Sequence, residues 1–215
     1  MADTVIVNEI ILSIQGEGSR AGLPCILVRL TGCNLNCFWC DTPSARAEGA
    51  ELPVGEVLAR VGEFNCHRVE VTGGEPLCQP AALELLRRLC DEGYETLLET
   101  NGSLDISPVD PRVARIVDFK CPSSTESDSI RWTNIEQLRG TDEAKFVIAD
   151  RRDYEFARDA VRAHGVGGKC PVIFSPASGT AAPAKLAEWI LADGLDVRLG
   201  MQLHKMIWPG RDRGV

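Results

Sequence analysis

Seven short runs rich in β-branched and apolar residues alternate with segments of helical periodicity, and this alternation constrains the fold more than any other feature. The runs cover residues 26–30, 68–72, 96–100, 115–120, 145–149, 171–175 and 196–201. Helical patterns cover 53–64, 80–93, 154–165 and 183–194, and a weaker one covers 129–138 within the polar stretch 121–142. Because strands and helices alternate, the sequence predicts a parallel sheet with crossover helices.

The polar motifs of the chain follow these runs at their carboxyl ends. They are TGCNLNCFWCDT, TGGEP, ETNG, DFKCPSS, SPASG and MQLHK, in chain order. Active sites of α/β barrels are built from the loops at this end of the strands. Seven strands are too few to close an eight-stranded barrel. The pattern therefore predicts an α/β fold, a partial (open) TIM-like β/α barrel, formed by residues 1–215 as a single domain.

Composition limits the class of protein. The 215 residues carry a formal net charge of −8, which argues against a broad electrostatic grip on nucleic acid. No apolar run approaches the roughly 20 residues that span a bilayer. The N-terminus, MADTVIVNEI, lacks the basic and apolar regions of a secretory signal. We therefore expect a cytoplasmic protein that binds neither nucleic acid nor a membrane.

Three of the nine cysteines, Cys33, Cys37 and Cys40, lie in one short loop with the spacing C-x3-C-x2-C. The odd total and a reducing compartment make a disulfide framework unfavourable. Thiolates favour zinc or iron–sulfur clusters. Three thiolates on a four-iron cubane leave one iron open to chelate a small molecule. Two alternatives remain: zinc completed by a distant histidine (His67, His164 or His204), and an electron-transfer cluster, which usually has a fourth cysteine.

The cysteine loop resembles the signature of the radical S-adenosylmethionine (SAM) superfamily, which has an aromatic residue before the last cysteine. TGGEP, at 72–76, resembles the GGE motif of that superfamily, whose backbone meets the methionine amino group of SAM. Glycines suit a close backbone approach. The resemblance implies a [4Fe–4S] cluster whose open iron chelates SAM, and reductive cleavage of SAM to a 5′-deoxyadenosyl radical.

Within the superfamily, the chain resembles the 7-carboxy-7-deazaguanine synthase family over nearly its whole length. The motifs QGEG, GCNLNCFWCDT, VTGGEP, ETNG and QLHK occur in the same order, with Arg29 between the first two. This family converts 6-carboxy-5,6,7,8-tetrahydropterin to 7-carboxy-7-deazaguanine with loss of ammonia, on the way to queuosine and related 7-deazapurines. SAM is regenerated, and Mg²⁺ helps to position the substrate carboxylate.

The resemblance also implies roles for individual positions. Cys33, Cys37 and Cys40 hold the cluster, and Thr42 binds Mg²⁺. The implied substrate contacts are Ile14, Gln15, Gly16, Glu17, Arg29, Thr72 and His204, and the implied SAM contacts are Trp39, Gly74, Asp118, Phe119, Lys120, Ser175, Pro176, Ala177 and Ser178. Arg29 is expected to meet the substrate carboxylate, because an unpaired charge is costly in its otherwise apolar run and a planar fork suits that partner.

The family also implies partners: the pterin as a small-molecule substrate, a low-potential electron donor of the flavodoxin or ferredoxin type, and a second copy in a homodimer. Two other functions stay open at this point. An activase of a glycyl-radical enzyme shares the cysteine loop and GGE but is not expected to have QGEG or QLHK. A zinc-stabilised binding protein without chemistry would leave Arg29 and His204 as surface residues, Glu99 and Lys205 in ordinary ion pairs, and Glu17 in a tight turn.

Overall fold

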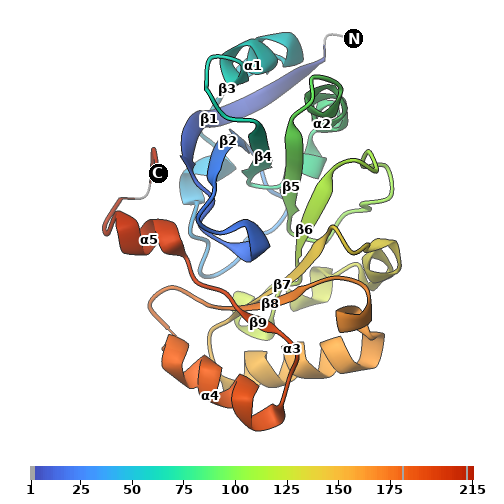
Figure 1. Cartoon of the computed structure of the whole chain (residues 1–215), viewed down its shortest axis with the longest axis vertical. Coiled ribbons are helices and arrows are strands. Elements are labelled where there is room, and N and C mark those ends of the chain that lie inside the picture. The colour runs from blue at the N-terminus through green and yellow to red at the C-terminus, as the bar shows by residue number, and fades with distance from the viewer. Residues whose placement is uncertain (1–2, 181, 212) are drawn as a thin grey trace.

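The computed structural model describes residues 3–180, 182–211 and 213–215, which fold around one nine-stranded sheet with the strand order β3-β1-β2-β4-β5-β6-β7-β8-β9. The two end strands are not paired with each other in this order, so the sheet is open (Figure 1). The strands are β1 (Thr4–Ile14), β2 (Pro24–Leu30), β3 (Ala50–Pro53), β4 (Arg68–Gly73), β5 (Glu95–Thr100), β6 (Ala114–Asp118), β7 (Glu143–Ile148), β8 (Val172–Pro176) and β9 (Arg198–Leu199). The predicted open barrel is confirmed.

All seven predicted strands are present as β2 and β4 to β9, and neighbours among them pair in parallel. The last is much shorter than predicted, because only Arg198 and Leu199 of the run 196–201 pair with β8. The parallel arrangement places the carboxyl ends of these strands at one edge of the sheet, as the positions of the motifs require.

Two strands were not predicted. β1 runs antiparallel to both β2 and β3. The sequence of β1 has no clean alternation, because Asn8 and Glu9 interrupt its apolar residues, and β3 is too short to give a signal. The consequence is functional: β1 and β2 form a hairpin whose connecting residues, 15–23, lie at the amino ends of the parallel strands.

The described residues form five α-helices: α1 (Val54–Val61), α2 (Ala81–Asp91), α3 (Arg151–His164), α4 (Pro183–Asp193) and α5 (Leu203–Ile207). The first four match the predicted segments. In α3, the Asp150 side chain accepts a hydrogen bond from Asp153 N (2.9 Å) at the N-cap, and Gly165 ends the helix with φ +61°. The segment 129–138 forms 3₁₀ turns instead of an α-helix, and α5 was not predicted.

The apolar core lies mainly between the sheet and the helices, in two large clusters, and Leu97, Ala114 and Ile116 form a third, small one. One large cluster is formed by α1 and α2 with β1, β2, β4 and β5, and the other by α3 and α4 with β6 to β8. Figure 1 shows these helix pairs toward opposite ends of the curved sheet. Because side chains alternate along a strand, the opposite, concave face receives the residues between the core positions. That face holds charged side chains from five strands: Arg29, Glu70, Glu99, Asp118 and Lys145.

We predict that Asp142→Asn destabilises the fold by about 3 kcal/mol, since removing one partner of a buried ion pair leaves the other charge uncompensated. Asp142 is fully buried, and its Oδ2 lies 2.6 Å from Arg115 Nη2. Urea unfolding of the variant measures the loss. Glu56→Gln, which removes the exposed pair with Arg60, is the control and is expected to leave the midpoint unchanged. Equal midpoints for the two variants would contradict the prediction.

Candidate active site

One cavity of about 220 Å³ lies on the concave face of the sheet, and it brings together motifs that are far apart in the sequence. Its lining includes every residue to which the sequence assigned a contact with the cluster, magnesium, SAM or substrate, with one exception. The exception is Phe119. The cysteine loop, the GGE segment, the carboxyl ends of β6 and β8, the QGEG segment and the QLHK segment therefore share one space.

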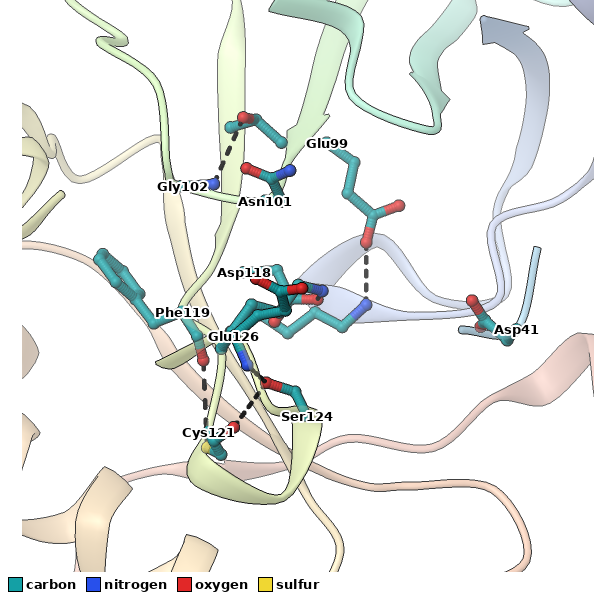
Figure 2. Close-up of polar contacts among 12 residues, drawn as sticks. Asp41, Glu99, Asn101, Gly102, Asp118, Phe119, Cys121, Ser124 and Glu126 are labelled. Atoms are coloured by element: carbon teal, nitrogen blue, oxygen red, sulfur yellow. Dashed lines mark hydrogen bonds and ion pairs between the residues drawn. The ribbon is translucent and has the colours of Figure 1, made fainter. Parts of the chain in front are cut away.

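Phe119 belongs to the core. Its side chain is fully buried and stacks on Phe146 and Trp132, with ring centroids 5.3 and 6.0 Å apart. Figure 2 shows its ring pointing away from Asp118 and Glu99. Phe119 does not line the cavity, and the SAM contact predicted for it stays a prediction. Its backbone N–H donates to the Lys145 carbonyl (2.8 Å), which fixes the flanking Asp118 and Lys120 at the cavity.

The cysteine loop is held by backbone contacts on several sides. Phe38 N donates to the Ser124 carbonyl (3.0 Å), and Arg46 donates to the Cys37 carbonyl (3.1 Å). All three thiols line the cavity, although among the described residues no three His, Cys, Asp or Glu side chains form a ready-made metal site. Burial raises the pKa of the Cys37 thiol.

The histidines do not favour the zinc alternative. His164 stacks on Trp132 (4.6 Å between centroids), and neither it nor His67 lines the cavity. His204 does line it, but its ring packs against Gly16, where a Cβ would lie 2.1 Å from His204 Nδ1. Burial lowers the pKa of His204. Three thiols without a fourth protein ligand gathered beside them fit a cluster with one open iron better than a tetrahedral zinc site.

Glu75, the acid of the GGE segment, organises the loops around it. It is fully buried and accepts hydrogen bonds from Asn101 N (2.6 Å), Thr100 Oγ1 (2.9 Å) and Leu77 N (3.0 Å). Burial raises the pKa of Glu75, and these hydrogen bonds oppose that change. The carboxylate therefore links the carboxyl end of β4 to that of β5. Asn101 in turn points its amide at Cys33 Sγ (3.8 Å).

The two glycines before Glu75 allow a close contact between backbones. A Cβ on Gly74 would lie 2.0 Å from the Gly32 carbonyl oxygen, and one on Gly73, which has φ +131°, would lie 2.1 Å from the Leu30 carbonyl oxygen. The sequence suggested that these glycines serve contact with a ligand. In the structure they also let the end of β4 press against the start of the cysteine loop.

The side of the cavity predicted to bind SAM carries three buried polar atoms that have no hydrogen-bond partner among the described residues: Trp39 Nε1, Asp118 Oδ1 and Ser175 Oγ. Lys120 bonds the other oxygen of Asp118 (2.7 Å) and lies over the Trp39 ring, 5.8 Å from its centroid. Buried polar groups without partners are costly and rare. Their presence on one wall indicates that a polar ligand completes them, which fits SAM.

The opposite side of the cavity is built by the β1–β2 hairpin, which enters from the amino ends of the strands. Ser19 and Arg20 bond Glu143, the first residue of β7, and Arg20 also pairs with Glu95, the first of β5 (2.8 Å). These contacts anchor the turn. Gln15 then donates to Glu70, and Glu17 pairs with Lys145 (2.5 Å).

Glu70 and Lys145 were missed by the sequence reasoning, and Glu99 was considered only as an ordinary ion pair. Lys145 Nζ lies 2.8 Å from Glu99 Oε1, and Thr72 Oγ1 donates to Glu99 Oε2 (3.0 Å). The signal that could have found Glu70 and Lys145 is alternation, because each stands between buried apolar residues of a strand whose other face is covered. Glu99 stands between Leu98 and Thr100, which are both buried.

Arg29 lines the cavity, as expected, and its Nε donates to Glu9 Oε1 of β1 (2.9 Å). The carboxylate of Glu9 thus partly offsets the energetic cost of burying the Arg29 guanidinium. Thr42 lies on the lining beside Asp41, and Lys205 beside His204.

Comparison with known proteins gives concordant results. Residues 27–122 match the family model described as the radical SAM superfamily. The 7-carboxy-7-deazaguanine synthase of Koribacter versatilis is 46% identical, over 97% of this chain and 99% of its own length. The 7-carboxy-7-deazaguanine synthase of Chlorobaculum tepidum is 45% identical, over 97% of this chain and 96% of its own length. The crystal structure of QueE from Escherichia coli matches with a TM-score of 0.79 at 24% identity, over 93% of this chain and 94% of that one, which shows the same fold.

We predict that Gly74→Ala lowers the iron bound after anaerobic reconstitution, because the added methyl group meets the Gly32 carbonyl and displaces the cysteine loop. Iron and sulfide analysis measures the effect. Gly140→Ala is the control, since a Cβ there meets nothing within 4 Å. A Gly74→Ala protein with the full iron content of the unsubstituted chain would show that the contact is not needed.

Proposed function

The chain belongs to the 7-carboxy-7-deazaguanine synthase family of the radical SAM superfamily, and we propose that its cavity converts 6-carboxy-5,6,7,8-tetrahydropterin to 7-carboxy-7-deazaguanine with release of ammonia. This is a carbon–nitrogen lyase reaction of queuosine and 7-deazapurine biosynthesis. The observation that carries the proposal is the meeting of the QGEG hairpin and the cysteine loop in one cavity. A glycyl-radical activase is not expected to have the QGEG hairpin.

Cys33, Cys37 and Cys40 hold a [4Fe–4S] cluster in this proposal. When bound, the cluster and SAM supply reversible hydrogen-atom abstraction from C6 of the pterin. Trp39, Asp118 and Ser175 bind SAM through their unpartnered buried atoms. Lys120, between Asp118 and the Trp39 ring, orients both. The backbone of Gly74 lies on the lining, where no Cβ blocks its approach to the cofactor.

The substrate lies between the SAM wall and the hairpin. Arg29 binds its carboxylate through the guanidinium N–H groups that Glu9 does not use, since Glu9 takes only Nε. The other contacts come from Ile14, Gln15, Gly16, Glu17, Thr72 and His204, all of which line the cavity. The lowered pKa of His204, which follows from burial, leaves a neutral ring able to accept or donate a hydrogen bond.

Mg²⁺ is bound by Thr42 in this proposal. The support is the position of Thr42 on the cavity lining, next to the carboxylate of Asp41. A single hydroxyl is enough when water and substrate oxygens complete an octahedral shell.

We further propose that the protein works in the cytoplasm, with a flavodoxin- or ferredoxin-type electron donor, as a homodimer. All nine cysteines are free thiols, as a reducing compartment requires. Phe38, beside two of the cluster cysteines, is 84% exposed, which gives a reductant access to that loop. Ile6 and Leu12 of β1 are each 44% exposed and supply apolar area for a second copy. None of the described helices has the length and apolar character needed to span a bilayer.

The test is an anaerobic assay. The protein is reconstituted with iron and sulfide and given SAM, a reductant, Mg²⁺ and 6-carboxytetrahydropterin. We expect a brown protein, an ultraviolet-absorbing deazaguanine product and no net loss of SAM. Cleavage of SAM without conversion of the pterin would refute the proposed substrate. A colourless protein that contains zinc would refute the proposed iron–sulfur cofactor.

We predict that Cys37→Ala abolishes assembly of the cluster, because two thiolates do not hold a cubane that requires three. Iron and sulfide analysis of the reconstituted protein, together with its brown colour, reports the loss. Cys66→Ala is the matched control, because Cys66 lies outside the cavity lining. A fully loaded Cys37→Ala protein would refute the ligand assignment.

We predict that Arg29→Lys lowers kcat/KM for the pterin by about 10-fold or more, since an ammonium group does not reproduce the bidentate fork and leaves Glu9 with a different partner. Cleavage of SAM without the pterin is expected to continue. Parallel assays of deazaguanine formation and SAM cleavage separate the two effects. Unchanged turnover of the pterin would exclude the carboxylate role of Arg29.

A further inference from the structure

Lys145, in the middle of β7, is the centre of the polar network on the hairpin side of the cavity. Its side chain is only 7% exposed, and its Nζ lies 2.5 Å from Glu17 Oε2 and 2.8 Å from Glu99 Oε1. Figure 2 shows the second contact as the dashed line at Glu99. The two carboxylates come from different elements, the hairpin and β5. Lys145 therefore joins an inserted turn to the wall of the barrel.

Each of these carboxylates is held on its other oxygen by a second cavity residue. Gln202 Nε2 donates to Glu17 Oε1 (2.8 Å), and Thr72 Oγ1 donates to Glu99 Oε2 (3.0 Å). Both donors line the cavity. Glu17 and Glu99 keep 18% and 29% of their side chains exposed, against 7% for Lys145. It is thus the carboxylates that reach the space for a ligand, with the amine behind them.

Negative groups outnumber positive ones around Lys145, because the carboxylates of Glu17, Glu70 and Glu99 lie around a single ammonium group. Glu70 has no ion-pair partner among the described residues and bonds only Gln15. Burial, with the negative charge of Glu99 adding to it, raises the pKa of Glu70 to about 8. Burial acts on Glu99 in the same direction, but the charge of Lys145 and hydrogen bonds from Lys145 and Thr72 outweigh it and hold that pKa at about 2. Lys145 thus holds Glu99 charged, whereas its charge does not offset the effect of burial on Glu70.

We propose that Lys145 is a positioning residue for the substrate: it fixes Glu17 and Glu99 as two charged, oriented acceptors for the N–H groups of the pterin ring. It acts through these carboxylates and does not touch the substrate. The inference rests on the proposed function, since a pterin presents amino and amide N–H donors on one edge of its ring. Two carboxylates held at fixed angles match such an edge.

A purely structural role is the alternative, and the same strand provides its comparison. Glu143, two residues before Lys145, also faces inward and bonds the hairpin, through Ser19 and Arg20. Unlike Lys145, it does not line the cavity. The two residues therefore hold the same turn, Glu143 from outside the cavity lining and Lys145 from the lining, behind the carboxylates of Glu17 and Glu99.

The experiment compares Lys145→Met, Lys145→Arg and Glu143→Gln in the reconstituted holoenzyme. KM and kcat for 6-carboxytetrahydropterin are measured beside the rate of SAM cleavage without pterin. We expect Lys145→Met to raise KM by about 10-fold or more, as loss of an oriented charged hydrogen bond does, with SAM cleavage within about twofold of the unsubstituted enzyme. Lys145→Arg keeps the charge and moves the donors, so its KM is expected between these values. Glu143→Gln is expected to lower the melting temperature and leave KM unchanged.

A second comparison tests whether Lys145 acts through Glu99. The loss in kcat/KM of Lys145→Met/Glu99→Gln is expected to be smaller than the product of the two single losses, because the interaction can be removed only once. A loss in kcat/KM of the double variant equal to the product of the two single losses would overturn the proposal. So would an unchanged KM in Lys145→Met, or equal losses of SAM cleavage and of pterin turnover in that variant. If Lys145→Met does not fold, a KM of Lys145→Arg equal to that of the unsubstituted enzyme would overturn it. An unsubstituted enzyme that cleaves SAM and leaves the pterin untouched would instead refute the proposed function.

Discussion

The structure depends on a requirement that every charge on the concave face of the open sheet find a partner. A parallel sheet covered by helices on its outer side normally buries apolar residues on both faces. Here the inner positions of five strands carry charged groups, and water cannot satisfy them all. The β1–β2 hairpin meets this requirement: Glu17 neutralises Lys145, Gln15 bonds Glu70, and Arg20 bridges Glu95 and Glu143. Without the hairpin, these ion pairs would be broken within the barrel.

The hairpin also explains how one small cavity serves two groups. Loops at the carboxyl ends of the strands deliver the three thiols and the GGE segment from one side. The hairpin delivers Gln15 and Glu17 from the amino ends of the same strands. Gln15 and Glu17 of the hairpin therefore meet, in the interior of the barrel, the cofactor contacts and the remaining substrate contacts, such as Thr72 and His204, which come from the carboxyl ends of the strands. The cofactor end can stay common to a superfamily of enzymes while the inserted turn sets the substrate.

Most of the parallel sheet could be predicted from the sequence, because its strands are β-branched runs, most of which are followed by a polar motif, and several are separated by helical patterns. Local pattern carries that information. It carries less about β1, because Asn8 and Glu9 interrupt its apolar residues and leave no clean alternation that would identify a strand. The residues of the barrel interior were harder still. Glu70 and Lys145 have no motif around them, and their partners are 55 and 128 positions away in the chain, respectively, at Gln15 and Glu17. Phe119 is the opposite case, because it lies in a sequence motif but its side chain packs in the core instead of lining the cavity.

β1, the strand that local pattern missed, has a larger part in the substrate end of the site than any predicted element. It ends in Ile14, next to Gln15, and it also supplies Glu9, which bonds Arg29. Arg29 and the hairpin are thus ordered by the same strand, at two points of its antiparallel pairing with β2, where Glu9 stands opposite Arg29. A shift of β1 by one residue would turn Glu9 to the other face. It would release Arg29 and withdraw Gln15 together, so the register of this one strand pair couples the expected carboxylate contact to the contacts with the ring.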